Sequence, residues 1–363
     1  MPIRPIFILC AMAASVQYAL CQVVELPIPD RTIVLDAKGQ PNAQMPVEIK
    51  FSPDDNVIIS RFRVNGKNDA LTRVDLNSRA QASIEIPRIK MSDGKGNSIS
   101  ILTDRSLYAI SNSSIQEVTF ADGKLSAVSH KLGWGNSEFT STSRASLVRM
   151  DKGALRLFRI TEDDAVEYLH FDTEKKEAET PISLGKFDKG DLHTHFYDSG
   201  SEIICGVSRP KSPATHFLSV NPADDKPELK PLFTVKDGCI SLQVQDDYYI
   251  VGTSKGVMTF LPKKGKDKPL DAQVLQMCIQ QVVVHKDGDG VYTCLVCGAD
   301  EGNSFAVARV NTKTGTIQSK IFKIAAKPAK VLAAFSNDGK TFALIDYNLK
   351  LSLFKTEQFK NLE

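Results

Sequence analysis

A turn that carries aspartate recurs along almost the whole chain, and this periodicity constrains the fold more than any other feature. Each turn stands between two short apolar runs, and neighbouring turns are separated by 41 to 51 residues. A period in this range indicates a repeat architecture, in which every unit is one small supersecondary element. The aspartates that mark the turns are Asp54, Asp104, Asp151, Asp198, Asp246, Asp287 and Asp338.

The internal pattern of a unit is clearest around Asp287. An apolar run at 279–285 leads through the turn KDGDG into 291–299, and two further runs at 304–310 and 316–324 follow another polar turn. The runs are short, rich in Val, Ile, Phe and Thr, and bounded by Gly, Asp and Asn, which is typical of strands joined by hairpin turns. We therefore predict about four antiparallel strands in each unit.

Seven such units predict an all-β fold, a seven-bladed β-propeller of four-stranded antiparallel blades. A sandwich of many strands is the alternative, but it would not need so regular a period. The last unit has only three runs, 330–335, 341–347 and 349–355, whereas a spare run at 31–36 precedes the first unit. We predict that 31–36 pairs with 349–355 and closes the ring, because closure removes the open sheet edges on which chains aggregate.

Two segments resemble the blades of WD-repeat or YVTN-type propellers. The segment VEIKFSPDDNVIIS (47–60) and the segment VLAAFSNDGKTFALIDYNLKLSLFK (331–355) both have an apolar strand that ends in Phe-Ser, an Asp-bearing turn and a second strand. The other five units match weakly, the Gly-His and Trp-Asp marks are missing, and Trp134 lies outside a blade motif. The resemblance implies the fold and the number of blades, and a fold alone does not define a function.

Residues 1–21 are predicted to be a secretory signal peptide. Arg4 provides a positive charge before an apolar run of about a dozen residues, and the small residues Ala19 and Cys21 precede a cleavage point before Gln22. The apolar run is too short for a membrane anchor, and no later stretch approaches the ~20 residues that a transmembrane helix needs. We expect residues 22–363 to form a single, monomeric propeller domain outside the cell or in the lumen of the secretory pathway.

The net charge argues against nucleic acid as a partner, and the number of cysteines supports export only in part. The chain has 45 Lys and Arg against 43 Asp and Glu, so its small net charge gives no basis for nucleic-acid binding. Five cysteines remain after the signal segment, an odd number that leaves at least one free thiol. A disulfide between Cys278 and Cys297 is conceivable if the hairpin turns at Gly288. The sequence Asn112-Ser-Ser is a candidate for N-glycosylation.

The sequence gives little evidence for a metal site. His193 and His195 flank Thr194 on an expected strand, where alternate residues share one side, and His216 is a conceivable third ligand. Packed or hydrogen-bonded histidines are the simpler interpretation. In an expected strand, Cys294 and Cys297 should face opposite sides, which argues against a zinc or redox pair. The turn KDGDG lacks the later ligands of a calcium loop. We expect no cofactor.

The resemblance to WD-type propellers also indicates a binding face. In such propellers, the loops that join second to third strands, and fourth strands to the next blade, share one end where partners bind. Here that end would carry the segments 61–69, 132–144 and 208–215. Arginine beside exposed aromatic residues is typical of interface hot spots, although a solvated loop is the plain alternative. The predicted partner-binding residues are Arg61, Arg63, Lys67, Trp134, Phe139, Arg144, Arg209 and Lys211.

These observations favour a secreted propeller that binds another protein, without catalysis. The sequence contains no G-x-S-x-G elbow, H-E-x-x-H helix or phosphate-binding loop. Two alternatives stay open. YVTN-like propellers include lactonases and other hydrolases, whose polar residues converge at the central channel from different blades, and the residue spacing does not reveal such convergence. A carbohydrate-binding propeller is the other alternative.

Overall fold

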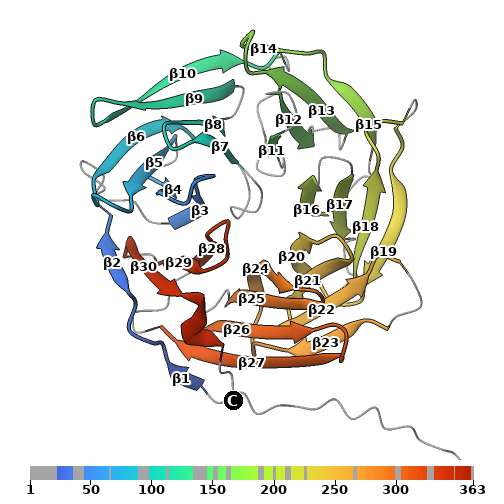
Figure 1. Cartoon of the computed structure of the whole chain (residues 1–363). Coiled ribbons are helices and arrows are strands. Elements are labelled where there is room, and N and C mark those ends of the chain that lie inside the picture. Colours follow the sequence, from blue (N-terminus) through green and yellow to red (C-terminus); the bar gives the residue numbers. More distant parts are fainter. Residues whose placement is uncertain are drawn as a thin grey trace, which may run out of the picture.

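Seven small β-sheets surround a common axis and form a closed ring (Figure 1). The computed structural model describes residues 23–35, 45–64, 67–88, 98–111, 114–133, 145–149, 154–160, 165–186, 192–198, 202–208, 214–224, 227–264, 268–298, 304–324, 331–346 and 348–360. The seven-bladed propeller predicted from the aspartate turns is confirmed. Residues 1–21 lie outside the described residues, so the signal peptide stays a prediction. The described part contains no helix with the length and hydropathy that a bilayer crossing requires.

The blades follow one another along the chain. The first three are blade 1 with β3 (Met45–Phe51), β4 (Val57–Arg63), β5 (Asn68–Asp75) and β6 (Gln81–Pro87); blade 2 with β7 (Ile99–Thr103), β8 (Ser106–Ile110), β9 (Ser114–Ala121) and β10 (Lys124–Lys131); and blade 3 with β11 (Ala145–Arg149), β12 (Ala154–Ile160), β13 (Ala165–Asp172), β14 (Glu177–Ala178) and β15 (Ile182–Lys186).

The remaining four blades complete the ring. They are blade 4 with β16 (Leu192–Asp198), β17 (Ile203–Ser208), β18 (Thr215–Val220) and β19 (Lys230–Val235); blade 5 with β20 (Cys239–Val244), β21 (Tyr248–Thr253), β22 (Val257–Pro262) and β23 (Leu270–Gln273); blade 6 with β24 (Ile279–Gly288), β25 (Val291–Gly298), β26 (Ser304–Asn311), β27 (Thr316–Lys323) and β1 (Val23–Glu25); and blade 7 with β28 (Leu332–Phe335), β29 (Thr341–Ile345), β30 (Lys350–Lys355) and β2 (Arg31–Val34).

The strand predicted to close the ring does so. β2 lies antiparallel to β30, with Arg31 opposite Leu353 and Val34 opposite Lys350, and the amide of Leu35 donates to the carbonyl of Leu349 at 2.9 Å. Blade 7 therefore takes its outermost strand from the start of the chain and its other three from the end. A fold with this closure has no open edge between its first and last blades.

Two blades depart from the expected four strands. β1 adds to the outer edge of blade 6, where Val23, Val24 and Glu25 lie parallel to Ile321–Lys323 of β27, so the N-terminal segment contacts two neighbouring blades. In blade 3 the outermost strand is divided, because β14 and β15 both pair with β13. The sequence did not indicate either feature.

Burial differs between the middle and the outside of a blade. In β25 every residue from Tyr292 to Gly298 is buried, because the neighbouring blades cover both faces of the sheet. In β10, at the outer edge of blade 2, most residues are exposed. The core consequently consists of apolar layers between adjacent blades rather than one central mass. Between blades 1 and 2, for example, Ile59 and Leu71 pack in one cluster with Ile99 and Leu107.

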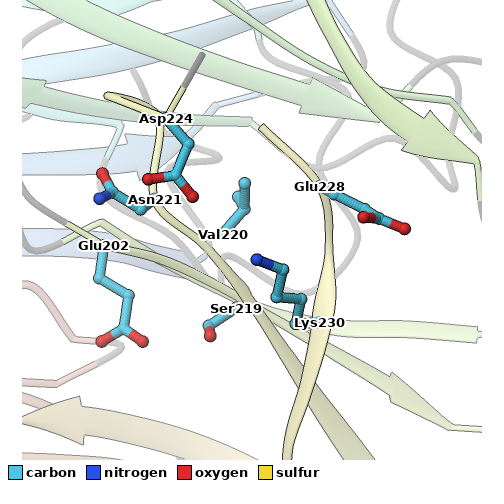
Figure 2. Close-up of a pocket in the computed structure, with 7 residues that line it drawn as sticks. All are labelled: Glu202, Ser219, Val220, Asn221, Asp224, Glu228 and Lys230. Atoms are coloured by element: carbon cyan, nitrogen blue, oxygen red, sulfur yellow. The ribbon is translucent and has the colours of Figure 1, made fainter. Parts of the chain in front are cut away.

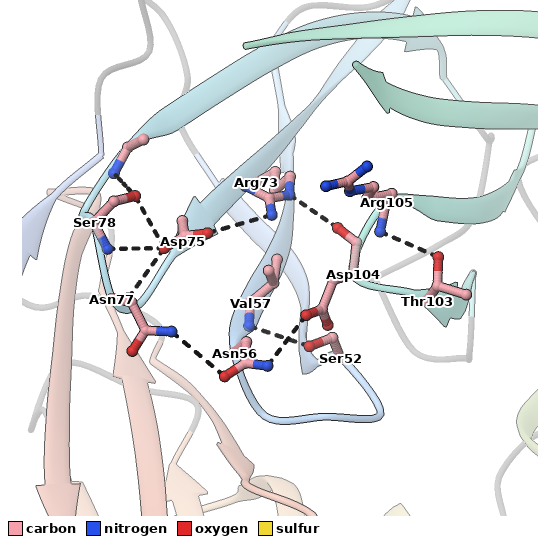
Figure 3. A network of polar contacts seen from close by, with 11 residues as sticks. Ser52, Asn56, Val57, Arg73, Asp75, Asn77, Ser78, Thr103, Asp104 and Arg105 are labelled. Carbon is pink, nitrogen blue, oxygen red and sulfur yellow. Dashed lines mark hydrogen bonds and ion pairs between the residues drawn. The ribbon is translucent and has the colours of Figure 1, made fainter. Parts of the chain in front are cut away.

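Polar contacts join blades 1 and 2 at the end that carries the aspartate turns (Figure 3). We call this end, with its connections from first to second and from third to fourth strands, the turn end. The Asn56 amide donates to Asp104 Oδ2 at 3.3 Å, and Arg73 Nε donates to the Asp104 carbonyl at 3.0 Å. The Arg73 guanidinium also stacks 4.0 Å from the centre of the Phe120 ring. Arg73 and Asp104 therefore tie the two blades together.

A second polar contact joins blades 7 and 1 across the closure. Asp55 Oδ1 accepts hydrogen bonds from the Asn337 amide nitrogen of the backbone at 2.8 Å and of the side chain at 2.7 Å. The same side chain donates to the Ser52 carbonyl at 2.7 Å. Asp55 has a φ of 57°, which Asp tolerates better than most residues. The Asp55 turn of blade 1 thus holds the Asn337 turn of blade 7, in addition to shaping its own hairpin.

The first prediction concerns this contact. Asp55→Ala removes the acceptors of Asn337 and places Ala in the left-handed region, so we expect the free energy of unfolding to fall by about 2–3 kcal/mol. Asp55→Asn retains one acceptor oxygen and the tolerance for this φ, so it should cost less. Urea unfolding of the three proteins measures the order, and an Asp55→Ala midpoint equal to that of the wild type would contradict it.

A second prediction concerns Gly256, in the turn between β21 and β22. Its φ is +81°, and a Cβ there would overlap the carbonyl oxygens of Leu275 and Met277, in the connection to blade 6. Gly256→Ala should lower the free energy of unfolding by about 3 kcal/mol or more, because φ strain and overlap act together. Gly123 has a φ of +75° with open space around it, so Gly123→Ala isolates the strain, about 1–2 kcal/mol. Equal losses in the two variants would refute the overlap.

Candidate functional site

A pocket of about 340 Å³ opens at the turn end of blade 4 (Figure 2). One wall comes from Glu202, directly before β17, and another from the last residues of β18. The connection 221–229 and the first residue of β19 complete it. The lining residues are Glu202, Ser219, Val220, Asn221, Asp224, Glu228 and Lys230. The volume lies in the range typical of small-ligand sites, but six of these seven side chains are polar or charged.

The charges of the pocket are mostly unpaired. Asp224, Glu228 and Lys230 are exposed and form no ion pair with any other described residue, whereas the Glu202 carboxylate is half-buried and hydrogen-bonded. Three carboxylates and one ammonium give the pocket a net negative charge. Such a lining can accept hydrogen bonds from a cation or a polar donor, and it can offer one ammonium to an acceptor.

Two tyrosines from the neighbouring blades hold the walls. The Tyr249 hydroxyl of blade 5 donates to Glu202 Oε2 at 3.4 Å. Burial, assisted by the negative charge of Glu202, raises the pKa of Tyr249 to about 12, so this hydroxyl keeps its proton. From blade 3, the Tyr168 hydroxyl donates to the Pro222 carbonyl at 3.3 Å. The backbone amide of Ala223 donates to Asn221 Oδ1 at 3.0 Å and closes an Asx turn.

The sequence did not single out this pocket. Its residues come from two connections of one blade and from the strand ends beside them, and only the fold brings Glu202 close to the segment 221–229. One signal was present: NPADDKPEL (221–229) is a long, charged and proline-containing connection in a fold whose hairpins mostly have tight turns. Long connections of this kind are frequent carriers of function in rigid scaffolds.

Arg61, predicted to be an exposed binding residue, is fully buried on β4. Its Nε donates to Asp69 Oδ2 at 2.7 Å, and its Nη1 donates to the Ile110 carbonyl of blade 2 at 2.9 Å. The expected loop 61–69 is therefore wrong at both ends, because β4 extends to Arg63 and β5 begins at Asn68. Burial outweighs the nearby arginines and raises the pKa of Asp69. Arg61 joins blades 1 and 2.

The other predicted binding residues are placed only in part. Arg63 is the half-buried last residue of β4, and Lys67 is exposed directly before β5. Both lie at the end opposite the pocket, which we call the loop end. The glycosylation candidate and the remaining binding candidates lie outside the described residues, so their roles stay predictions; they are Asn112, Trp134, Phe139, Arg144, Arg209 and Lys211.

The backbone separates the candidate metal ligands. His193 of β16 and His216 of β18 lie on either side of Val207 in the register of three adjacent strands, which places their backbones roughly 10 Å apart. The register of β16 also shifts between His193 and His195, so simple alternation does not hold there. His216 Nδ1 lies 3.0 Å from the Thr234 hydroxyl. Among the described residues, no group of three or more metal-ligating side chains is suitably arranged.

None of the five cysteines after the signal segment forms a disulfide. Cys205, Cys239, Cys294 and Cys297 are buried, and Cys278 is half-buried, so the disulfide considered for Cys278 and Cys297 is not formed. Burial raises the pKa of the Cys205 and Cys294 thiols. A raised pKa lowers the thiolate fraction, so these two thiols are poor nucleophiles at neutral pH.

The fold and the pocket together define a seven-bladed β-propeller with a polar, preformed cavity on one blade. No protein-family model matches the chain, and no curated protein matches it. The argument about function therefore rests on the residues of this chain.

A third prediction concerns the buried ion pair. Asp69→Leu leaves the Arg61 charge buried without its carboxylate and should cost about 3–5 kcal/mol of stability. The double variant Arg61→Met/Asp69→Leu removes both charges, and we expect it to be more stable than Asp69→Leu alone. A double-mutant cycle in urea, completed by Arg61→Met, measures the coupling. Additive losses would show that the two side chains do not depend on each other.

Proposed function

We propose that this chain is an exported propeller that binds another protein. The observation that carries the proposal is the pocket on blade 4, because its walls are fixed from both neighbouring blades and its Asp224, Glu228 and Lys230 side chains form no ion pair with a described residue. Groups held in place before binding lose little entropy on complex formation. Unpaired charges at a surface contribute to steering and specificity when a partner of complementary charge docks.

The closed ring suits this role. Each blade presents connections at both ends, so a partner can contact several blades without any change in the fold. Export is proposed from the signal sequence in residues 1–21 and the expected cleavage before Gln22. We also propose a second contact area at the loop end, around Lys67 and the other binding residues predicted there apart from the buried Arg61. The hydrolase and carbohydrate-binding alternatives have no described residue group in their favour.

The proposal predicts recovery of a specific partner. The full chain with a C-terminal tag would be expressed in secreting cells, cross-linked in the medium and purified, with an unrelated tagged propeller as the control. We expect a protein that is enriched with this chain only and that binds again when both components are purified. N-terminal sequencing of the exported chain should begin at Gln22. Failure to enrich any protein over the control would contradict a binding role, and retention in the cytosol would contradict export.

A further inference from the structure

We propose that the outer edge of β10, on blade 2, pairs with an extended strand of the partner protein that carries a carboxylate at each end. The inference rests on the proposed binding function and names a surface and a chemistry for it. It follows from the backbone groups that β10 presents, from a comparison with the outer strands of the other blades, and from two lysines at the ends of β10.

β10 turns half of its backbone hydrogen-bonding groups away from its own blade. Asp122 and Gly123 both have positive φ and form a two-residue turn between β9 and β10, so the residues on either side of the turn exchange both backbone hydrogen bonds. Phe120, opposite Leu125, instead donates its amide to the Arg105 carbonyl at 2.8 Å, on the side away from β10. The pairing continues without a register shift, and in an antiparallel ladder the two kinds of pair alternate. The residues of β10 whose N–H and C=O groups face outward are therefore Leu125, Ala127, Ser129 and Lys131.

This edge lies at the outer rim of the ring (Figure 1). β10 is the last strand of its sheet and pairs with β9 alone. Most of its eight residues are exposed, and the apolar side chain of Val128, near the middle of the strand, is 57% exposed. A strand that paired with β10 would satisfy the outward backbone groups and cover Val128 at the same time.

The outer strands of the other blades are covered, divided, short or interrupted by proline. β27 of blade 6 is covered by β1, and the outer strand of blade 3 is divided into β14 and β15. β23 and β2 have four residues each. β6 ends in Pro87 and β19 contains Pro231, and proline has no N–H to donate. Folded proteins protect sheet edges by these means, so the long and regular edge of β10 is an exception among the described outer strands.

Blade 6 already contains a contact of the kind that we propose. β1 adds to the outer edge of β27 through Val23, Val24 and Glu25, and it comes from a part of the chain far from that blade in sequence. The outer strand of a blade in this ring therefore pairs with a strand that is not continuous with it. In such pairing the backbone hydrogen bonds supply affinity, and the side chains of the added strand supply specificity.

Two lysines determine which strand the edge accepts. Lys124 and Lys131 lie at the two ends of β10, both are exposed, and neither forms an ion pair with a described residue. Antiparallel pairing of the whole of β10 with a second copy would place Lys124 opposite Lys131 at both ends, and like charges in opposite positions destabilise a sheet. A strand with a carboxylate at each end would meet an opposite charge at both positions. The edge therefore favours an acidic-ended strand over a second copy of this chain.

The first experiment uses the full chain and the fluorescein-labelled peptide EVTVTVTE, with anisotropy at low salt as the readout. In antiparallel pairing its glutamates lie opposite the two lysines and a valine lies opposite Val128. We expect Lys124→Glu and Lys131→Glu each to weaken binding about three- to tenfold, because attraction is replaced by repulsion. Lys186→Glu is the matched control, since Lys186 is an exposed lysine at the end of the outer strand β15 of blade 3. It should change affinity by less than about 1.5-fold.

A charge swap tests the contact directly. The peptide KVTVTVTK should bind the wild type more weakly than EVTVTVTE does, and the double variant Lys124→Glu/Lys131→Glu should reverse this order. A merely structural role of the lysines would not produce the reversal. The double variant and the wild type should have similar urea midpoints, since both lysines are exposed.

Ala127→Pro tests the backbone contact. The Ala127 N–H faces outward, so proline removes a donor that β9 does not use and is tolerated better there than in a central strand. We expect the binding of EVTVTVTE to weaken about tenfold or more, because proline removes a donor from the edge and its ring obstructs the added strand. Circular dichroism and a urea midpoint check that this variant is folded. If it does not fold, the charge swap decides the inference alone.

The inference is overturned if the lysine variants bind EVTVTVTE as the wild type does, or if Lys186→Glu weakens binding as much as they do. It is also overturned if the wild type forms a dimer in analytical ultracentrifugation that Ala127→Pro abolishes, because a second copy would then occupy the edge. Its failure is distinguishable from failure of the proposed function. A partner recovered equally by the wild type and the β10 variants overturns this contact and leaves the binding function in place. Peptide binding with the expected charge swap, but without a recovered partner, supports the edge and contradicts the function.

Discussion

The pairing of β2 with β30 is the interaction on which the rest of the molecule depends. Adjacent blades bury their apolar faces against each other, so each sheet is stable only when it has a neighbour on both sides. A row of seven sheets would leave two such faces in water, and the hydrogen bonds between Arg31–Val34 and Lys350–Leu353 bring those faces together. Loop-closure entropy rises only slowly with chain length, so one short strand can hold a ring of this size.

Side-chain contacts between blades reinforce this closure. Asn337 binds Asp55 and Ser52 across the junction of blades 7 and 1, and Gln281 makes two hydrogen bonds with the backbone of Ala333 between blades 6 and 7. These polar contacts lie beside apolar layers that have no directional preference of their own. Their contribution is to fix the angle and register between the blades that they join.

The sequence predicted the fold well because the repeat is a local signal. Alternating strands and aspartate turns are read within one unit, and the missing strand of blade 7 could be deduced by counting. The burial of Arg61 could not be deduced from the sequence, because it depends on the Ile110 carbonyl of another blade. The same holds for the pocket, since Glu202 and Asp224 are neighbours only after β17 and β18 have paired. The shift of register between His193 and His195 is a backbone irregularity that no residue pattern predicts.

The closing strand also sets a condition on biosynthesis. β2 is synthesised before blade 1 and its partner β30 after blade 6, so β2 has no place in a sheet until the strands of blade 7 have been made. A product that ends early can still form several blades, but the faces of its first and last blades stay exposed because no neighbouring blade covers them. Such apolar faces are surfaces that chaperones and proteases encounter. Completion of the chain is thereby coupled to escape from quality control.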